Sequence, residues 1–218
     1  MTEIESHRKP QSIRDRIAFA FVKVLRFFAD LFFRKRYGHR AVVLETVAAV
    51  PGMVAGLLQH LRAIRRMRDD QGWIKELLDE AENERMHLMT FIQVAKPSLF
   101  ERGLILIAQA IFYNFYFFLY LFAPKTAHRV VAYFEEEAVT SYTSYLEEID
   151  AGRLENIPAP KLAIEYWELP ANARLRDVVI AVRADEAGHR DRNHYFADAL
   201  IEGEEPQSEP ATYALRRT

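Results

Sequence analysis

The sequence predicts an all-α protein built from six long helices. Apolar residues recur at steps of three and four over long segments, which is the period of an amphipathic helix. No segment shows the alternation of apolar and polar residues that marks a half-buried strand. Glycine and proline fall mainly between the periodic segments, where they end helices. A length of 218 residues suits one domain, residues 1–218, with a sizeable core.

Helix ends can be assigned from proline, glycine and capping residues along the chain. The expected helices cover residues 12–33, 40–62, 73–94, 101–122, 126–149 and 172–200. Pro51 lies inside the second helix and should kink it. Asp69 or Asp70 is expected to cap the third, and a proline-rich loop should precede the last. Residues 1–12 and 203–218 have the polar composition of flexible ends.

The overall composition excludes several classes of protein. With no cysteine, the chain cannot hold a disulfide, a zinc–thiolate site or an iron–sulfur cluster. The formal net charge of −2 gives no bias toward nucleic acid, so no nucleic-acid partner is expected. The opening residues are acidic and polar, and they do not resemble a secretory signal or a transit peptide. This beginning fits either a bacterial protein or a chain given without its leader.

The first and fourth expected helices carry unusual amounts of apolar surface. Residues 7–40 contain ten Lys or Arg against two Asp, interleaved with many aromatic residues. This pattern favours anionic lipid head groups over nucleic acid. Residues 104–123 contain only Gln109 and Asn114 as polar side chains, and the segment has the length of a membrane span.

Two Glu-x-x-His units, Glu84–His87 and Glu186–His189, lie far apart in the sequence. Two more glutamates, Glu45 and Glu135, lie in otherwise apolar helical stretches. All four segments keep these side chains in phase with the apolar stripe of their helix. One Glu from each of two helices and a Glu-x-x-His from each of two others is the ligand set of a dinuclear carboxylate bundle.

Charge supports the metal interpretation of these six residues. Four unpaired carboxylates in a core would each cost several kcal/mol, whereas two divalent cations would cancel their charge. Oxygen and nitrogen ligands without sulfur suit iron or manganese. We therefore predict a ferritin-like four-helix bundle with a dinuclear centre of iron or manganese, accompanied by two additional helices. A single Glu-x-x-His in a helix would usually be a surface pair.

Four sequence blocks carry a resemblance to a known family. LETVAAVPGMV (44–54), NERMHLMTF (83–91), FEEEAVTSY (134–142) and RADEAGHRDRNH (183–194) resemble the signature blocks of the alternative oxidases. The resemblance continues between them through about residues 26–198. It implies a cyanide-insensitive, di-iron ubiquinol oxidase and places the iron ligands on the same six residues.

The resemblance also implies roles for further residues. Tyr142 is implied to be the catalytic tyrosine beside the metals. Six positions are implied to line the quinol pocket: Arg26, Asp30, Arg40, Leu44, Ala138 and Ser141. Five more are candidates for outer partners, the side chains that hydrogen-bond to the metal ligands and hold them in place: His60, Asn83, Asp185, Tyr166 and Trp167. His128 matches a family position too, although a surface histidine on a helix would explain it equally.

The ligand map bears on how the chain meets a membrane. A crossing by residues 104–123 alone would put Glu84 and Glu135 on opposite sides and split the site. We therefore expect a monotopic protein whose first and fourth helices lie in the membrane surface. The resemblance implies the inner membrane, facing the cytoplasm in a bacterium or the matrix in a mitochondrion. It also implies a homodimer.

The sequence thus predicts a membrane ubiquinol oxidase that reduces dioxygen to water at two iron ions without pumping protons. One rival is a di-iron quinone hydroxylase, which would release a hydroxylated quinone. The other is a ferritin-like iron-binding protein, which would need a soluble surface able to form a cage.

Overall fold

The computed structural model describes residues 7–33 and 36–202, and these residues contain seven helices and no β-strand. The helices are α1 (Ile13–Phe33), α2 (Tyr37–Arg66), α3 (Trp73–Ala95), α4 (Leu99–Phe122), α5 (Pro124–Asp150), α6 (Lys161–Tyr166) and α7 (Leu175–Glu202). The predicted all-α class and its six long helices are confirmed. The short helix α6, inside the proline-rich loop, was not predicted.

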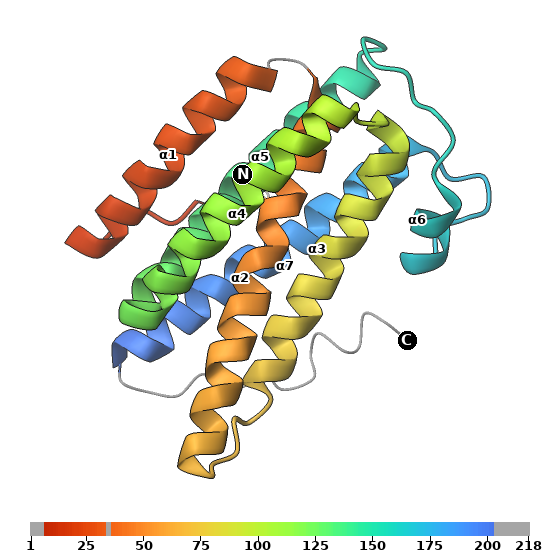
Figure 1. The fold of residues 1–218 in the computed structure, drawn as a ribbon. Coiled ribbons are helices and arrows are strands. Elements are labelled where there is room, and N and C mark those ends of the chain that lie inside the picture. The colour runs from red at the N-terminus through yellow and green to blue at the C-terminus, as the bar shows by residue number, and fades with distance from the viewer. Residues whose placement is uncertain (1–6, 34–35, 203–218) are drawn as a thin grey trace.

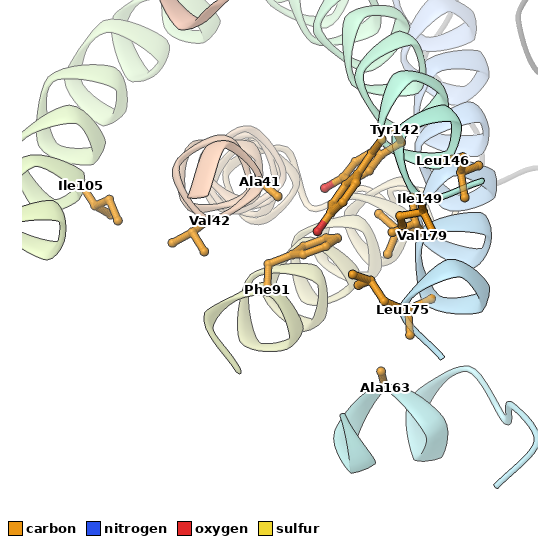
Figure 2. Close-up of a cluster of buried hydrophobic side chains, with 13 residues drawn as sticks. Ala41, Val42, Phe91, Ile105, Tyr142, Leu146, Ile149, Ala163, Leu175 and Val179 are labelled. Carbon is orange, nitrogen blue, oxygen red and sulfur yellow. The ribbon is translucent and has the colours of Figure 1, made fainter. Parts of the chain in front are cut away.

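Helices α2, α3, α5 and α7 lie side by side as the central bundle, and α1 and α4 lie across one side of it (Figure 1). Two hydrophobic clusters join the four central helices. The first contains Ala41 and Val42 of α2, Phe91 of α3, Tyr142 and Tyr145 of α5, and Val178, Val179 and Val182 of α7. Figure 2 shows the ring of Phe91 beside that of Tyr142. The second cluster contains Val50 and Val54, Trp73 and Leu77, Phe112, Tyr116 and Tyr120, Ala127 and Val131, and Phe196 and Leu200.

The helix ends differ slightly from the predicted ones for local reasons. α4 begins at Leu99 because Ser98 and Glu101 form a capping box, with the Ser98 hydroxyl accepting from the Glu101 amide. α2 runs unbroken through Pro51 to Arg66, and its capping residue Met67 has a left-handed backbone. The side chain of Asp70 accepts from the amide of Ile74 in the first turn of α3.

The predicted flexible ends are only partly described. Residues 203–218 and the first six residues lie outside the described part of the chain. Within residues 7–12, the Arg8 guanidinium donates to both carboxylate oxygens of Asp198, at 2.5 and 3.0 Å. The His7 ring contacts the carboxylate of Glu136. The beginning of the described chain is therefore bound to α5 and α7.

Two described helices are long and apolar enough to cross a membrane, α2 and α4. The apolar stretch of α2 is mostly buried in the bundle, as expected for a core helix. In α4 only 11% of the apolar stretch is buried, so most of its side chains face outward.

The close packing of α2 on α3 depends on Gly52. A Cβ atom at this position would lie 2.4 Å from the backbone oxygen of Leu77 and 3.0 Å from the Cβ of Ala81. We expect Gly52→Ala to lower the free energy of unfolding by about 1–3 kcal/mol, because backbone must move to admit the methyl group. Thermal unfolding followed by circular dichroism in detergent measures this effect.

Gly103 in α4 is the matched control, because nothing lies within 4 Å of a Cβ placed there. Gly103→Ala should leave stability unchanged or raise it by up to about 1 kcal/mol through helix propensity. Equal effects of the two substitutions would contradict the proposed role of Gly52 in the α2–α3 contact.

Candidate metal centre

Four side chains from three helices meet in the middle of the bundle. They are Glu45 of α2, Glu84 and His87 of α3, and Glu186 of α7, and each offers a ligand atom within 4.8 Å of the others. None is more than 2% exposed. The His87 Nδ1 atom lies 3.3 Å from a carboxylate oxygen of each of the three glutamates.

The other two predicted ligands lie at the same place. The Nδ1 atom of His189 is 2.6 Å from Oε1 of Glu84 and 3.9 Å from Oε2 of Glu186. Glu135 of α5 is buried beside them: after burial itself, the charges of Glu186 and Glu84 are what most raise the pKa of its carboxyl. The structure therefore brings together all six residues that the spacing selected, and we call them the Glu/His cluster.

Unsatisfied polar atoms test whether a cation fits the Glu/His cluster. Both carboxylate oxygens of Glu84, both of Glu186, and Nδ1 of His189 are buried without a hydrogen-bond partner among the described residues. The approach of His189 Nδ1 to Glu84 Oε1 is close but lacks hydrogen-bond geometry. Such atoms are costly unless something between them accepts their lone pairs. A cation does so, and an oxygen and nitrogen donor set suits iron or manganese.

The pKa values of the cluster describe its charge when no cation is bound. Burial, followed by the charges of Glu84 and Glu45, raises the pKa of Glu186 to about 7. Burial also raises the pKa of Glu84 and of Glu135 well above the ordinary value, with neighbouring carboxylates adding to the effect. For Glu45 burial acts in the same direction, but the hydrogen bond and charge of His87 outweigh it and lower the pKa. The metal-free cluster thus retains protons that a cation would displace.

Tyr142 lies against the Glu/His cluster. Its hydroxyl donates to Oε1 of Glu45, and its ring stacks on Phe91 with 5.6 Å between centroids. Burial, and then the charge of Glu45, raises the pKa of the phenol well above its usual value. Tyr142 is therefore a neutral phenol that holds its proton next to a cluster carboxylate.

Four of the five predicted outer partners lie together on one side of the cluster. Asp185 accepts from Nε1 of Trp167 at 2.8 Å and from Nδ2 of Asn83 at 3.0 Å, and it lies 3.3 Å from Nε2 of His87. Asn83 also donates to the hydroxyl of Tyr166. Burial would raise the pKa of Asp185, but the hydrogen bond and charge of His87 outweigh it and lower the pKa to about 2. The Nε2 side of His87 is thus fixed, which leaves Nδ1 facing the cluster.

His60, the fifth predicted outer partner, is not brought to the cluster. Its side chain is exposed on α2. It lies fifteen residues beyond Glu45, which corresponds to about 22 Å along a helix. The apolar stripe of α2 did not reveal this, because a histidine can lie at the edge of such a stripe.

A second buried network was missed from the sequence. Nδ2 of Asn193 lies 2.9 and 3.0 Å from the two carboxylate oxygens of Glu80, and its Oδ1 accepts from Nδ1 of His128 at 2.9 Å. The hydroxyl of Tyr120 is 3.1 Å from Nε2 of His128. Burial lowers the pKa of His128 to about 4, so this ring is neutral and not a surface histidine. Sequence spacing could have revealed this network, because Glu80 precedes Glu84 by one helical turn and Asn193 follows His189 by one turn.

A largely apolar cavity of about 690 Å³, including its open mouth, adjoins the Glu/His cluster. Three cluster carboxylates, Glu45, Glu135 and Glu186, form its inner end. Four of the six predicted pocket residues line it: Arg26, Arg40, Leu44 and Ala138.

The other two predicted pocket residues lie behind the lining. Asp30 accepts from Nε of Arg26 at 2.8 Å and from Arg40, so it holds both guanidinium groups in place. Ser141 is buried on α5 and does not line the cavity.

The chain is similar in sequence to members of one known family. The family model for alternative oxidase matches residues 2–198. The mitochondrial ubiquinol oxidase of Batrachochytrium dendrobatidis is 64% identical over 89% of this chain and 62% of its own length. Mitochondrial ubiquinol oxidases 1a of Oryza sativa subsp. japonica and Arabidopsis thaliana are 56% and 57% identical over 96% of the chain. The chain spans about three fifths of the length of these relatives (62%, 63% and 59%).

The raised pKa of Glu186 predicts how the metal-free protein responds to pH. The folded pKa of about 7 lies above the unfolded value of 4.5, so the folded state binds the proton more tightly. The resulting stability is present below pH 4.5 and is lost as pH rises through 7. Glu186→Gln carries no such proton. Between pH 5 and 8 the chelated parent should therefore lose on the order of 2–3 kcal/mol relative to the chelated variant.

Denaturant unfolding in detergent at several pH values measures this difference. Glu82→Gln on the exposed side of α3 is the control and should differ from the parent by a small, nearly constant amount. A stability difference between the parent and Glu186→Gln that does not change with pH would contradict the buried, protonated state of Glu186.

Proposed function

The chain belongs to the alternative oxidase family, and from that premise we propose that it is a ubiquinol oxidase that reduces dioxygen to water at a di-iron centre. One observation carries the proposal most directly. Five buried donor atoms of Glu84, Glu186 and His189 converge without hydrogen-bond partners beside an apolar cavity. Such a cavity suits a quinol ring, and such a cluster suits a pair of redox metal ions.

The proposed ligands are the six residues of the Glu/His cluster, Glu45, Glu84, His87, Glu135, Glu186 and His189. When bound, two iron ions supply the one-electron redox chemistry toward dioxygen that side chains lack. Neighbouring side chains hold two of these ligands in place. Asp185 holds His87, and Asn193 donates to the backbone oxygen of His189 at 3.0 Å.

The cavity supports the choice of quinol as reductant. Reduction of one dioxygen to two waters takes four electrons and four protons, which two quinols supply without protons from elsewhere. The walls of the cavity are apolar, and Arg26 and Arg40 are fixed donors that suit quinol oxygens. Tyr142 carries an oxidisable phenol whose hydroxyl donates to Glu45, and its proposed role is that of a relay.

Helix α1 forms one wall of the cavity through Val22, Leu25, Arg26 and Ala29. A buried arginine holds the beginning of this helix. Nε of Arg129 donates to Asp15 of α1 at 3.0 Å, and its Nη2 donates to Asp198 of α7 at 2.5 Å. Further along α1, Arg26 donates to the Glu137 carboxylate at 2.8 Å. These contacts give the pocket a preorganised wall.

Exposed apolar side chains support a monotopic membrane location. On α1 they include Ile13, Ile17, Phe27, Phe28 and Leu31, and on α4 Leu106, Ile107, Ile111, Phe118 and Phe122. Both helices flank one side of the bundle (Figure 1). Glu84 precedes α4 and Glu135 follows it, yet both belong to one cluster, which disfavours a crossing by α4 alone. We propose insertion into the inner membrane, on the matrix side in a mitochondrion or the cytoplasmic side in a bacterium.

A second apolar surface supports a homodimer. Met53, Leu57, Leu61 and Ile64 are exposed on α2, and Leu78 is exposed on the adjoining α3. A contiguous patch of this kind suits a second copy of the chain.

Oxygen uptake by the purified, iron-loaded protein with ubiquinol tests the function. We expect uptake that continues in cyanide and two quinols oxidised per dioxygen. The absence of uptake at full iron content would refute the oxidase proposal. A hydroxylated quinone, detected by mass spectrometry, would support the quinone hydroxylase instead.

Removal of one hydroxyl tests the role proposed for Tyr142. Tyr142→Phe should lower kcat at least 100-fold while the iron content is retained, because only the bond to Glu45 is lost. Tyr145→Phe is the matched control. Its ring packs on the same Phe91, with 6.4 Å between centroids, but it is not in the proposed machinery. Comparable turnover in the two variants would argue against a role for the Tyr142 phenol.

Filling the cavity tests where the quinol binds. Ala138 lines the cavity on α5, so Ala138→Leu should raise the KM for quinol about tenfold or more by occupying that space. Thr140→Leu, exposed on the same helix, should leave KM unchanged. Initial rates at varied quinol concentration decide between these outcomes, and an unchanged KM in Ala138→Leu would place the substrate elsewhere.

A further inference from the structure

A second apolar trough lies between the end of α1, the beginning of α2 and the first half of α4. It encloses about 830 Å³, including its open mouth, and shares no lining residue with the cavity beside the Glu/His cluster. Its floor is apolar, with Val42 and Ile105 buried, and its rim includes the exposed Ile107 and Ile111. From Glu101 to Ile111 the trough follows α4 for about 15 Å, which is long enough to hold much of one acyl chain.

One end of the trough is polar, because His39 and Glu101 line it there. The carboxylate of Glu101 lies 2.6 Å from Nη2 of Arg36 and 2.9 Å from Nδ1 of His39. The capping box holds the same carboxylate, because Oε2 accepts from the amide of Ser98 at 2.8 Å. The fixed carboxylate of Glu101 thus holds Arg36 by a hydrogen bond and lies close to His39 at this end of the trough.

The surrounding charge is positive overall. Lys96 and Arg102 are exposed, and they flank Pro97 and Glu101, which line the trough. This excess of cationic side chains complements an anionic group located where the trough opens.

We propose that this trough binds one acyl chain of an anionic phospholipid, with the phosphate against Arg36 and His39. A lipid tail gains little by leaving other tails for an apolar groove, so selectivity must come from shape and from the head group. The cationic end supplies that selectivity, and the two-sided character of the site matches the amphipathic ligand. The proposal rests on the membrane location proposed above.

Two other occupants fit the site less well. A quinol tail would have to leave the cavity beside the cluster, whose lining is separate. A second copy of the chain has a more continuous apolar surface available on α2, around Leu57 and Leu61. Neither explains the cationic cluster at the end of the trough.

Native mass spectrometry of the full chain tests the proposal. The delipidated protein is mixed in detergent with dioleoyl phosphatidylglycerol or dioleoyl phosphatidylcholine, and retained lipids are counted. We expect at least tenfold more retained phosphatidylglycerol than phosphatidylcholine. Ala108→Phe should abolish retention because Ala108 lines the trough, and Val43→Phe should do the same from the opposite wall. Ala110→Phe, exposed two residues away on α4, should behave as the parent.

Charge reversal tests the head-group end. Arg36→Glu should remove the preference for phosphatidylglycerol, whereas Arg65→Glu at the other end of α2 should preserve it. Retention unchanged by both trough-filling variants overturns the proposal, as does equal retention of the two lipids by the parent. Recovery of quinone instead of phospholipid, or dissociation of a dimer by Ala108→Phe, also overturns it.

Flotation with phosphatidylglycerol-containing vesicles separates this proposal from the membrane location itself. A parent that does not float refutes the location, and the lipid site with it. A parent that floats but retains no phosphatidylglycerol refutes the lipid site alone. Floating by Ala108→Phe together with lost lipid retention is the expected result.

Discussion

The burial of four carboxylates within one small volume is the constraint on which the rest of the structure depends. Glu45, Glu84, Glu135 and Glu186 lie in the core together with the imidazoles of His87 and His189. A bundle can tolerate such a centre only by keeping protons on it or by binding cations. The helices that supply these residues must therefore stay in register, which explains the tight α2–α3 contact at Gly52.

The residues around the Glu/His cluster limit its freedom on two sides. Toward the α6 loop, Asp185 takes hydrogen bonds from Asn83 and Trp167 and faces His87. Toward α4, the amide of Asn193 bonds to the carboxylate of Glu80 and is itself held by His128. The outer polar groups thus satisfy one another, and the unsatisfied atoms of Glu84, Glu186 and His189 are left at the centre. Such preorganisation favours a cation over collapse of the cluster.

Much of the fold and the candidate site followed from periodicity, because a step of three or four residues assigns a side chain to a helix face. That reasoning found the six cluster residues and placed Tyr142 on the same face as Glu135. It could not say which charges meet across helices, so the pairing of Arg129 with Asp15 and Asp198 was missed. It also could not place His60, and it missed α6, whose six residues are too short for a periodic signal.

Helix α1 links the proposed chemistry to the proposed membrane surface. Its inner face supplies Val22 and Arg26 to the cavity wall, while its outer face exposes Phe27 and Phe28. A lipid-dissolved quinol would then need to cross only the thickness of this helix to approach Glu135. The wall must stay closed against water yet admit a ring from the side. Arg129 at one end and Glu137 further along hold the helix backbone in place, so only side chains would have to move to admit the ring.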